Sequence, residues 1–205
     1  MVNRSISIEG QTVVVSCADE LQQQADWLLG VLAQMHHSGQ LIKEGKRVQV
    51  GGSFLSFHRL PSGYLSVAEP DIEKNPFQDE TTDVSGTLKV LSGQFALAKQ
   101  LSVEPVATTF QDKIVMDKNC LQSDDLYMHR GELNALGNDS GWFIGRQGAR
   151  DPASELEAIY AFQLLKQRPE LFPALILPVG YMVMVNSEGI QAIMNANNEK
   201  VFGAD

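Results

Sequence analysis

The chain has 205 residues, of which 43% are hydrophobic and 20% are charged, and its net charge is -9. This composition is typical of a folded globular protein, and the acidic charge disfavours direct binding to nucleic acid or to an anionic membrane surface. Neither a membrane span nor a secretion signal is indicated, because Pro178 and Gly180 divide the longest apolar runs and the first residues, "MVNRSISIEGQTVVVS", lack a signal pattern. Cys17 and Cys120 are too few for a disulfide framework, so we expect reduced thiols and a cytoplasmic location.

The first half of the chain predicts one helix and several strands. A short β-rich segment at 12–15 leads into an amphipathic helix that Gly39 is well placed to end. The stripe of this helix consists of apolar residues spaced alternately four and three apart, namely Leu21, Ala25, Leu28, Leu32 and Met35. Segments 46–52, 53–60 and 64–70 follow, and their β-branched and aromatic residues predict an antiparallel hairpin or meander.

Residues 69–83, "EPDIEKNPFQDETTD", are expected to form an exposed acidic loop. Pro70 and Pro76 interrupt any regular element there, and only Lys74 offsets the acids. The acids of the segment are Glu69, Asp71, Glu73, Asp79, Glu80 and Asp83. Such a loop presents its side chains to solvent, so we expect it to contribute to partner recognition; the alternative is a solvated loop without a partner.

The second half of the chain predicts two further long helices and a short one. Apolar residues at spacings of four and three indicate a helix over about 83–100, and Asp151–Pro152 opens a third helix that runs through Gln167. The segment 187–195, "SEGIQAIMN", is expected to form a short closing helix. Strands are predicted in four segments separated by polar turns, at 110–120, 125–130, 141–145 and 181–185.

Together these elements predict an α+β fold in which a mostly antiparallel sheet is covered by about three main helices. We divide the chain into residues 1–110 and 111–205 and expect the two portions to form one compact unit. The core of the second portion is expected to contain Trp142, Leu156, Tyr160 and Val183. Structural roles are assigned to Trp142 and to three turn formers that precede predicted strands, Gly141, Pro178 and Gly180.

No catalytic, cofactor-binding or metal-ligating residue is assigned. A thiol nucleophile needs a base beside it, and neither cysteine forms a recognisable motif with a histidine. The histidines also lack partners at metal-ligand spacing; they are His36, His37, His58 and His129. The paired acids Asp79–Glu80 and Asp124–Asp125 are typical of solvated turns rather than of two carboxylates in different environments. An enzyme is therefore not indicated.

Five segments between residues 112 and 186 occur in an informative order. They are "DKIVMDKNC", "LYMHR" with Tyr127 and Arg130, "DSGWFIG", a helix after Asp151, and Pro169 followed by "LPVG". In this order the segments resemble immunity protein family thirty-three of bacterial polymorphic toxin systems. The chain departs from the family pattern at 147–149, where "QGA" stands in place of an acidic residue, so no role of that acid is transferred.

The resemblance implies a cytoplasmic protein that binds a cognate toxin or secreted effector and blocks it by direct contact, without catalytic residues or cofactors. The acidic surface would steer a basic partner, such as a nuclease. The residues expected at the contact are Glu69, Asp71, Glu73, Asp79, Glu80, Asp124, Asp125 and Asp139. Two alternatives stay open: an effector-binding adaptor or chaperone of a secretion system, and a hydrolase with an unrecognised site.

Overall fold

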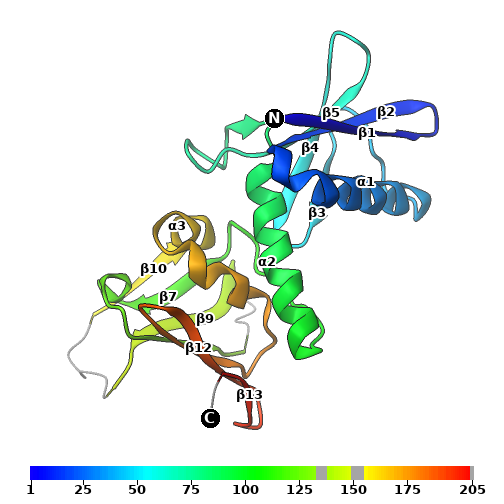
Figure 1. Cartoon of the computed structure of the whole chain (residues 1–205). Coiled ribbons are helices and arrows are strands. Elements are labelled where there is room, and N and C mark those ends of the chain that lie inside the picture. The colour runs from blue at the N-terminus through cyan, green and yellow to red at the C-terminus, as the bar shows by residue number, and fades with distance from the viewer. Residues whose placement is uncertain (133–137, 149–154, 204–205) are drawn as a thin grey trace. The chain divides into compact units, whose positions relative to one another are not determined.

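The computed structural model describes residues 1–132, 138–148 and 155–203 (Figure 1). The chain divides into two compact units, Met1–Ser92 (unit 1) and Gly93–Asp205 (unit 2). Strands and helices occur in both units, which confirms the predicted α+β class. None of the helices within the described residues is long and apolar enough to cross a membrane.

Unit 1 is built on a six-stranded sheet. Its strands are β1 (Val2–Ile8), β2 (Gln11–Cys17), β3 (Arg47–Val50), β4 (Ser53–Arg59), β5 (Leu65–Pro70) and β6 (Glu80–Thr81). Its helices are η1 (Asp19–Leu21), α1 (Gln22–His37) and the first part of α2 (Ser85–Leu101), which ends in unit 2. The strand order is β1-β2-β5-β4-β3, and β6 pairs with β5.

The core of unit 1 forms where α1 and the start of α2 pack on one face of this sheet. Alternation along β2 turns Val13 and Val15 to this face, and both are fully buried. Leu28 and Leu32 of α1 and Leu88 of α2 belong to the same cluster. The apolar stripe therefore predicts α1 correctly, and Figure 1 shows this helix running along β1 and β2.

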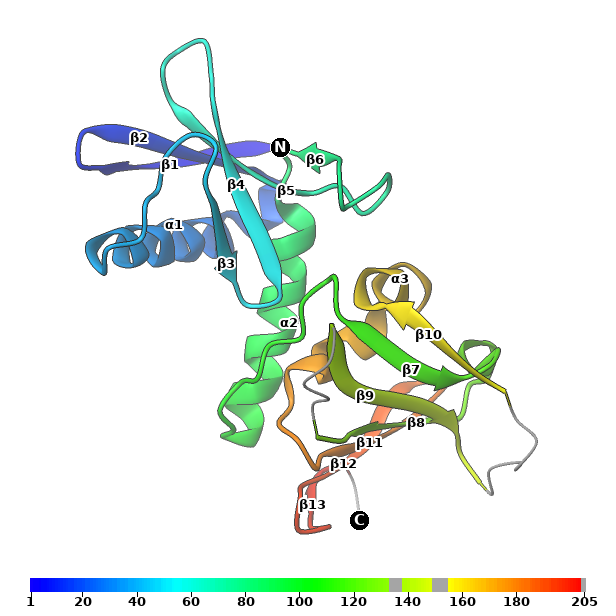
Figure 2. The same ribbon diagram turned by 180° about the vertical axis from the view of Figure 1, so that it is seen from behind.

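Unit 2 is built on a seven-stranded sheet (Figure 2). Its strands are β7 (Lys113–Asp117), β8 (Leu126–Arg130), β9 (Asp139–Arg146), β10 (Leu156–Tyr160), β11 (Met182–Asn186), β12 (Gly189–Met194) and β13 (Lys200–Phe202). Its helices, besides the end of α2, are η2 (Cys120–Gln122), α3 (Ala161–Gln167) and the 3-10 helix η3 (Pro169–Ile176). The strand order is β10-β7-β9-β8-β11-β12-β13.

Both sheets are mixed, which corrects the expectation of one mostly antiparallel sheet. The pairs β2–β5 and β7–β9 are parallel, whereas the other strand pairs of both sheets are antiparallel, including the non-hairpin pairs β10–β7 and β11–β8. Among the described residues, four helices longer than one turn, α1, α2, α3 and η3, replace the three main helices that the sequence predicts. The additional helix, η3, is missed because Pro173 lies inside it.

The prediction of a long third helix is wrong over much of its length. Residues 151–154 lie outside the described residues, Leu156–Tyr160 form β10, and only Ala161–Gln167 form α3. The apolar residues of β10 suit either period, and the strand is favoured because β7 offers an edge to pair with. The predicted helix end before Arg168–Pro169 is confirmed.

Burial in unit 2 separates the four residues predicted for its core. Trp142 and Val183 are 1% and 0% exposed, which confirms their place in the core. Leu156 is 52% exposed on the edge strand β10, and Tyr160 is half-buried, so the core prediction is wrong for Leu156. The predicted helix would bring both residues to one face, but Leu156–Tyr160 form a strand instead.

The expected closing helix at 187–195 is instead strand β12, which pairs antiparallel with β11. A short apolar run does not distinguish a strand from a helix by its pattern alone. Here β11 supplies partners for the backbone groups of the segment, and a hairpin forms. The strand prediction for 181–185 is confirmed by β11 itself.

Candidate partner-binding surfaces

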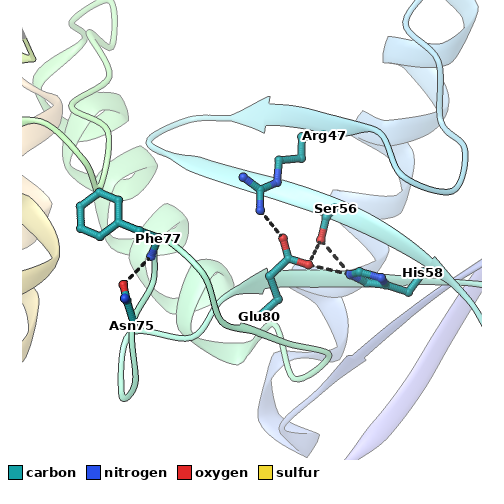
Figure 3. Close-up of polar contacts among 6 residues, drawn as sticks. All are labelled: Arg47, Ser56, His58, Asn75, Phe77 and Glu80. Atoms are coloured by element: carbon teal, nitrogen blue, oxygen red, sulfur yellow. Dashed lines mark hydrogen bonds and ion pairs between the residues drawn. The ribbon is translucent and has the colours of Figure 1, made fainter.

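The acidic loop (69–83) is anchored to the sheet of unit 1 through Glu80 (Figure 3). The Glu80 carboxylate accepts hydrogen bonds from Ser56 Oγ at 2.7 Å and His58 Nε2 at 2.6 Å, and it pairs with Arg47 Nη2 at 2.6 Å. Burial opposes the charged form, but the hydrogen bonds from Ser56, Arg47 and His58 outweigh it and hold the pKa of Glu80 below its usual value. We call these four residues the Glu80 cluster.

Between Asp71 and Asp79 the acidic loop is ordered by its own hydrogen bonds. Asp71 N donates to the Asp79 carbonyl at 2.9 Å, which closes the base, and Asp79 N donates to the Asn75 carbonyl at 2.7 Å. Asn75 Oδ1 accepts from Phe77 N at 3.1 Å, an Asx turn visible in Figure 3. The loop is therefore a defined surface feature rather than a loose connection.

The acids of the loop differ in exposure. Glu73 and Asp79 are exposed, whereas the side chains of Asp71 and Glu80 are 13% and 20% exposed and are paired with Lys74 and Arg47. Phe77, which the sequence does not single out, is 43% exposed on the same loop. Aromatic residues are enriched at protein-binding surfaces. Its only sequence signal is an aromatic residue within a polar, proline-flanked segment.

Glu69, the first acid of the loop, lies inside the fold. It is 7% exposed at the end of β5, and its Oε2 accepts a hydrogen bond from Thr87 N at 2.7 Å in the first turn of α2. Burial, only partly offset by the hydrogen bonds from Thr87, raises the pKa of Glu69 to about 7. Glu69 is therefore a capping group for α2, and we leave it out of the contact surface proposed below.

Glu69→Gln is expected to remove a fall in stability with rising pH. The folded-state pKa of about 7 exceeds the ordinary 4.5, so the folded protein binds more protons between these values and its stability falls as the pH rises through them. Gln keeps the acceptor for Thr87 N but cannot ionise. At pH 8 the variant should exceed the wild type in free energy of unfolding by about 3 kcal/mol, and at pH 4 the two should agree, as measured by urea unfolding.

Glu80→Gln is the matched control for this measurement, and its expected effect on stability has the opposite sign because the pKa of Glu80 is lowered rather than raised. Because the pKa of Glu80 is lower in the folded state, its charge stabilises the fold at pH values above the ordinary pKa of a glutamate. This contribution is lost as the pH falls through the folded-state pKa. The variant should therefore be less stable than the wild type at pH 7, with the difference shrinking in acid. A Glu69→Gln variant whose stability follows that of the wild type across pH 4–8 would show that Glu69 stays charged in the fold.

In unit 2 the motif residues Arg130 and Trp142 form a buried pair. Arg130 is 1% exposed, and its guanidinium donates to the carbonyls of Val106 and Leu177 at 2.7 Å each and of Ser140 at 3.2 Å. Its Cζ lies 5.7 Å from the centroid of the Trp142 ring. Burial lowers the pKa of Arg130 to about 10, so the group stays charged at neutral pH. These contacts join three segments of unit 2 at one point.

The turn formers of unit 2 support this pair. Gly141 has a φ of 73°, which favours glycine, and its N–H donates to Asp139 Oδ1 at 2.9 Å. Gly180 has a φ of 87°, and a Cβ there would lie 2.7 Å from the Ala196 Cβ. The turn that begins at Pro178 lets Gly180 N donate to the Arg130 carbonyl at 2.7 Å. Each turn thus places a backbone beside the buried arginine or tryptophan.

The remaining acids proposed at the contact lie at two ends of the sheet of unit 2. Asp124 and Asp125 are exposed just before β8, whereas Asp139 is partly exposed at the start of β9 and occupied by its turn. In the antiparallel pair β8–β9, Leu126 lies opposite Arg146, at the far end of β9 from Asp139. The structure therefore brings Asp124 and Asp125 together but not Asp139.

Both thiols are buried. Burial raises the pKa of Cys17, and it raises the pKa of Cys120 to about 11, so neither is activated as a nucleophile. Within residues 1–132, 138–148 and 155–203, no group of three or more His, Cys, Asp or Glu side chains is arranged to hold a metal ion.

Comparison with known proteins identifies a family. A family model described as an Imm33-like domain matches residues 93–196, which is half of the chain. The resemblance seen in the segment 112–186 is thereby confirmed over a longer stretch. Neither the curated proteins nor the solved structures contain a significant match to the chain.

Proposed function

The chain belongs to the Imm33-like domain family, and from this premise we propose that it is an immunity protein, which binds and neutralises a cognate bacterial toxin or secreted effector by direct contact. The observation that carries the proposal is the position of the match. Residues 93–196 fall within unit 2, Gly93–Asp205, so the family segment corresponds to one compact unit. Unit 2 would hold the toxin, in the cytoplasm of the cell that makes it.

Neutralisation by binding requires a stable scaffold, a surface of complementary charge and a few apolar anchors. The net charge of -9 would speed the association of a basic partner, and a nuclease is a partner class of that charge. In unit 1 the acidic loop supplies exposed acids and an exposed aromatic, Phe77, on one ordered segment. We propose this loop as a secondary contact that steers the toxin.

Co-expression tests the function. The chain is produced together with the protein encoded by the adjacent gene, and growth and complex formation are followed. Rescue of growth together with a stable complex is the expected result. A complex without rescue would favour an effector-binding adaptor or chaperone, and rescue without a complex would favour an enzyme that modifies the toxin.

Neutralising Glu73 and Asp79 together, as Glu73→Gln with Asp79→Asn, is expected to slow association about three- to tenfold at low salt, because exposed acids steer a basic partner over long range. At 0.5 M salt the difference should vanish, since the Debye length is then about 4 Å. The amides keep the acceptor atoms, including the one on residue 79 that Asn75 N uses at 3.1 Å, so thermal stability should hardly change. Stopped-flow kinetics at two ionic strengths measure this.

The control for this pair is Glu20→Gln with Glu44→Gln, which makes the same change in net charge at other exposed sites of unit 1. If the loop itself steers the partner, the control pair should slow association at low salt less than the loop pair does. Equal rates for the two double variants would assign steering to net charge alone, and the loop would then be a solvated segment without a partner.

A further inference from the structure

One face of the sheet in unit 2 is left uncovered by the described helices. The helices of this unit pack on the face that holds Trp142, whose Nε1 donates to the Leu175 carbonyl of η3 at 3.3 Å. On the same side, Gln94 Nε2 of α2 donates to the Phe172 carbonyl of η3 at 3.4 Å. Figure 2 shows β7 and β9 from the opposite side, where no helix lies in front of them.

Strand alternation brings apolar and aromatic side chains to this second face. Register places Tyr127 beside Met184 and His129 beside both Met182 and Phe143, so the five residues form a continuous patch across β9, β8 and β11. All five are partly exposed, while their sequence neighbours Met128, Trp142 and Val183 are buried on the other side. We call Tyr127, His129, Phe143, Met182 and Met184 the open face.

Two aromatic rings give the open face its shape. The centroids of Tyr127 and Phe143 lie 5.8 Å apart at 41° between planes. Tyr127 lies over Gly145, where a Cβ would approach Tyr127 Cε1 to 2.6 Å. A side chain larger than glycine at 145 would thus push the ring away from the sheet. Gly145 keeps the aromatic surface low and close to the strands.

Acids gather at one end of the open face. Leu126 pairs with Val185, so Asp124 and Asp125, just before β8, lie next to the turn between β11 and β12 that carries Glu188. All three acids are exposed. Gln147 Nε2 holds this end together by donating to the Leu126 and Val185 carbonyls at 3.1 and 2.8 Å. The surface is therefore apolar in the middle and negative at one end.

We propose that the open face is the surface on which unit 2 binds the toxin, and that the bound toxin segment carries apolar side chains beside a lysine or arginine. This inference rests on the proposed function. Aromatic residues and methionine are enriched at protein interfaces, and methionine adapts to the shape of a partner. The acidic end complements a basic residue. A second copy of the chain is disfavoured as occupant, because each copy carries a net charge of -9.

The test uses the protein encoded by the adjacent gene as probe, with the full chain and Met184→Glu compared by calorimetry. A charge in the middle of the open face should weaken the affinity at least about tenfold, since interface centres tolerate buried unpaired charge poorly. Leu41→Glu makes the same kind of change at a residue of unit 1 that is 53% exposed, and it should bind like the wild type. Circular dichroism confirms that each variant is folded.

Hydrogen exchange of the wild type provides a reading that needs no variant. When the probe binds, the amides in 126–130 and 182–186 should exchange more slowly. In a separate kinetic measurement, the double variant Asp124→Asn with Asp125→Asn should show a smaller salt dependence of association. Wild-type binding with an unchanged Met184→Glu affinity, or without protection of these strands, would overturn the open face while leaving the proposed function in place. A wild type that neither binds nor rescues would overturn the function and the inference together. A homodimer that Met184→Glu converts to monomer would assign the face to a second copy instead.

Discussion

Replacing Trp142 by alanine is expected to lower the free energy of unfolding of unit 2 by about 3–5 kcal/mol, the usual range for deleting a buried large aromatic. Trp142 is 1% exposed in β9, a central strand of its sheet. The change removes the ring from the core, the hydrogen bond from Nε1 to the Leu175 carbonyl and the face over which Arg130 lies. Arg130, which lies beside the ring, belongs to β8, and β8 is paired on both sides, so this neighbour cannot move far into the space.

Urea unfolding followed by circular dichroism measures this loss. The chain has two tryptophans, so in the Trp142→Ala variant the fluorescence comes from Trp27 of α1 and reports on unit 1. Trp27→Ala is the matched control, because Trp27 is 42% exposed and its loss should cost less than about 1.5 kcal/mol. A change below about 1 kcal/mol for Trp142→Ala would contradict the burial of the ring.

Replacing Arg130 by methionine is expected to destabilise unit 2 by about 2–4 kcal/mol, although methionine fills much of the same volume. The guanidinium donates hydrogen bonds to the carbonyls of Val106, Leu177 and Ser140. Each of these acceptors would lose this donor inside the protein. A buried acceptor left without a donor costs about 1–3 kcal/mol. Arg130→Lys should recover part of the loss, because one ammonium reaches some but not all of the carbonyls.

Arg59→Met is the control for this measurement. Arg59 is exposed in β4 and pairs with Glu44 at the surface, so its replacement should change stability by less than about 0.5 kcal/mol. If Arg130→Met unfolds at the same urea concentration as the wild type, the carbonyls around Arg130 are satisfied in another way, and the buried pair does not hold unit 2 together.

The strands that carry the family resemblance direct alternate side chains to opposite faces of the sheet in unit 2. Arg130 of "LYMHR" and Trp142 of "DSGWFIG" point into the core, while Tyr127 and Phe143 of the same strands lie on the open face. Stability and binding can therefore be separated by experiment. Substitutions on the core side should lower stability, and those on the open face should lower affinity at nearly unchanged stability.

Local patterns in the sequence are sufficient to predict the two long helices, α1 and α2. The four-and-three spacing predicts α1 and α2 because a helix that covers a sheet needs a continuous apolar stripe. The order of motifs from 112 to 186 identifies the family without any knowledge of the fold. The chemistry of turn residues also indicates the breaks between the strands of unit 2.

Pairing partners decided the elements that the sequence misassigned. β10 and β12 have apolar patterns that suit a helix as well as a strand, and each became a strand because β7 and β11 offered an edge. β1 was missed, since it lies at the edge of its sheet and alternates polar with partly buried residues. A single sequence contains no information on which distant strand will supply the hydrogen bonds.

The candidate surfaces also depend partly on the sequence alone and partly on the tertiary structure. Composition alone locates the acidic loop, because prolines and clustered acids disfavour a regular element there. The ends of the segment nevertheless form strands, since Glu69 and Pro70 end β5 and pair with Glu80–Thr81 of β6. Only the tertiary structure places Glu69 inside, against the first turn of α2, and holds Glu80 with Arg47, Ser56 and His58 from neighbouring strands. The open face likewise exists only once β8, β9 and β11 lie side by side, because its side chains come from segments that strand register, and not sequence spacing, brings together.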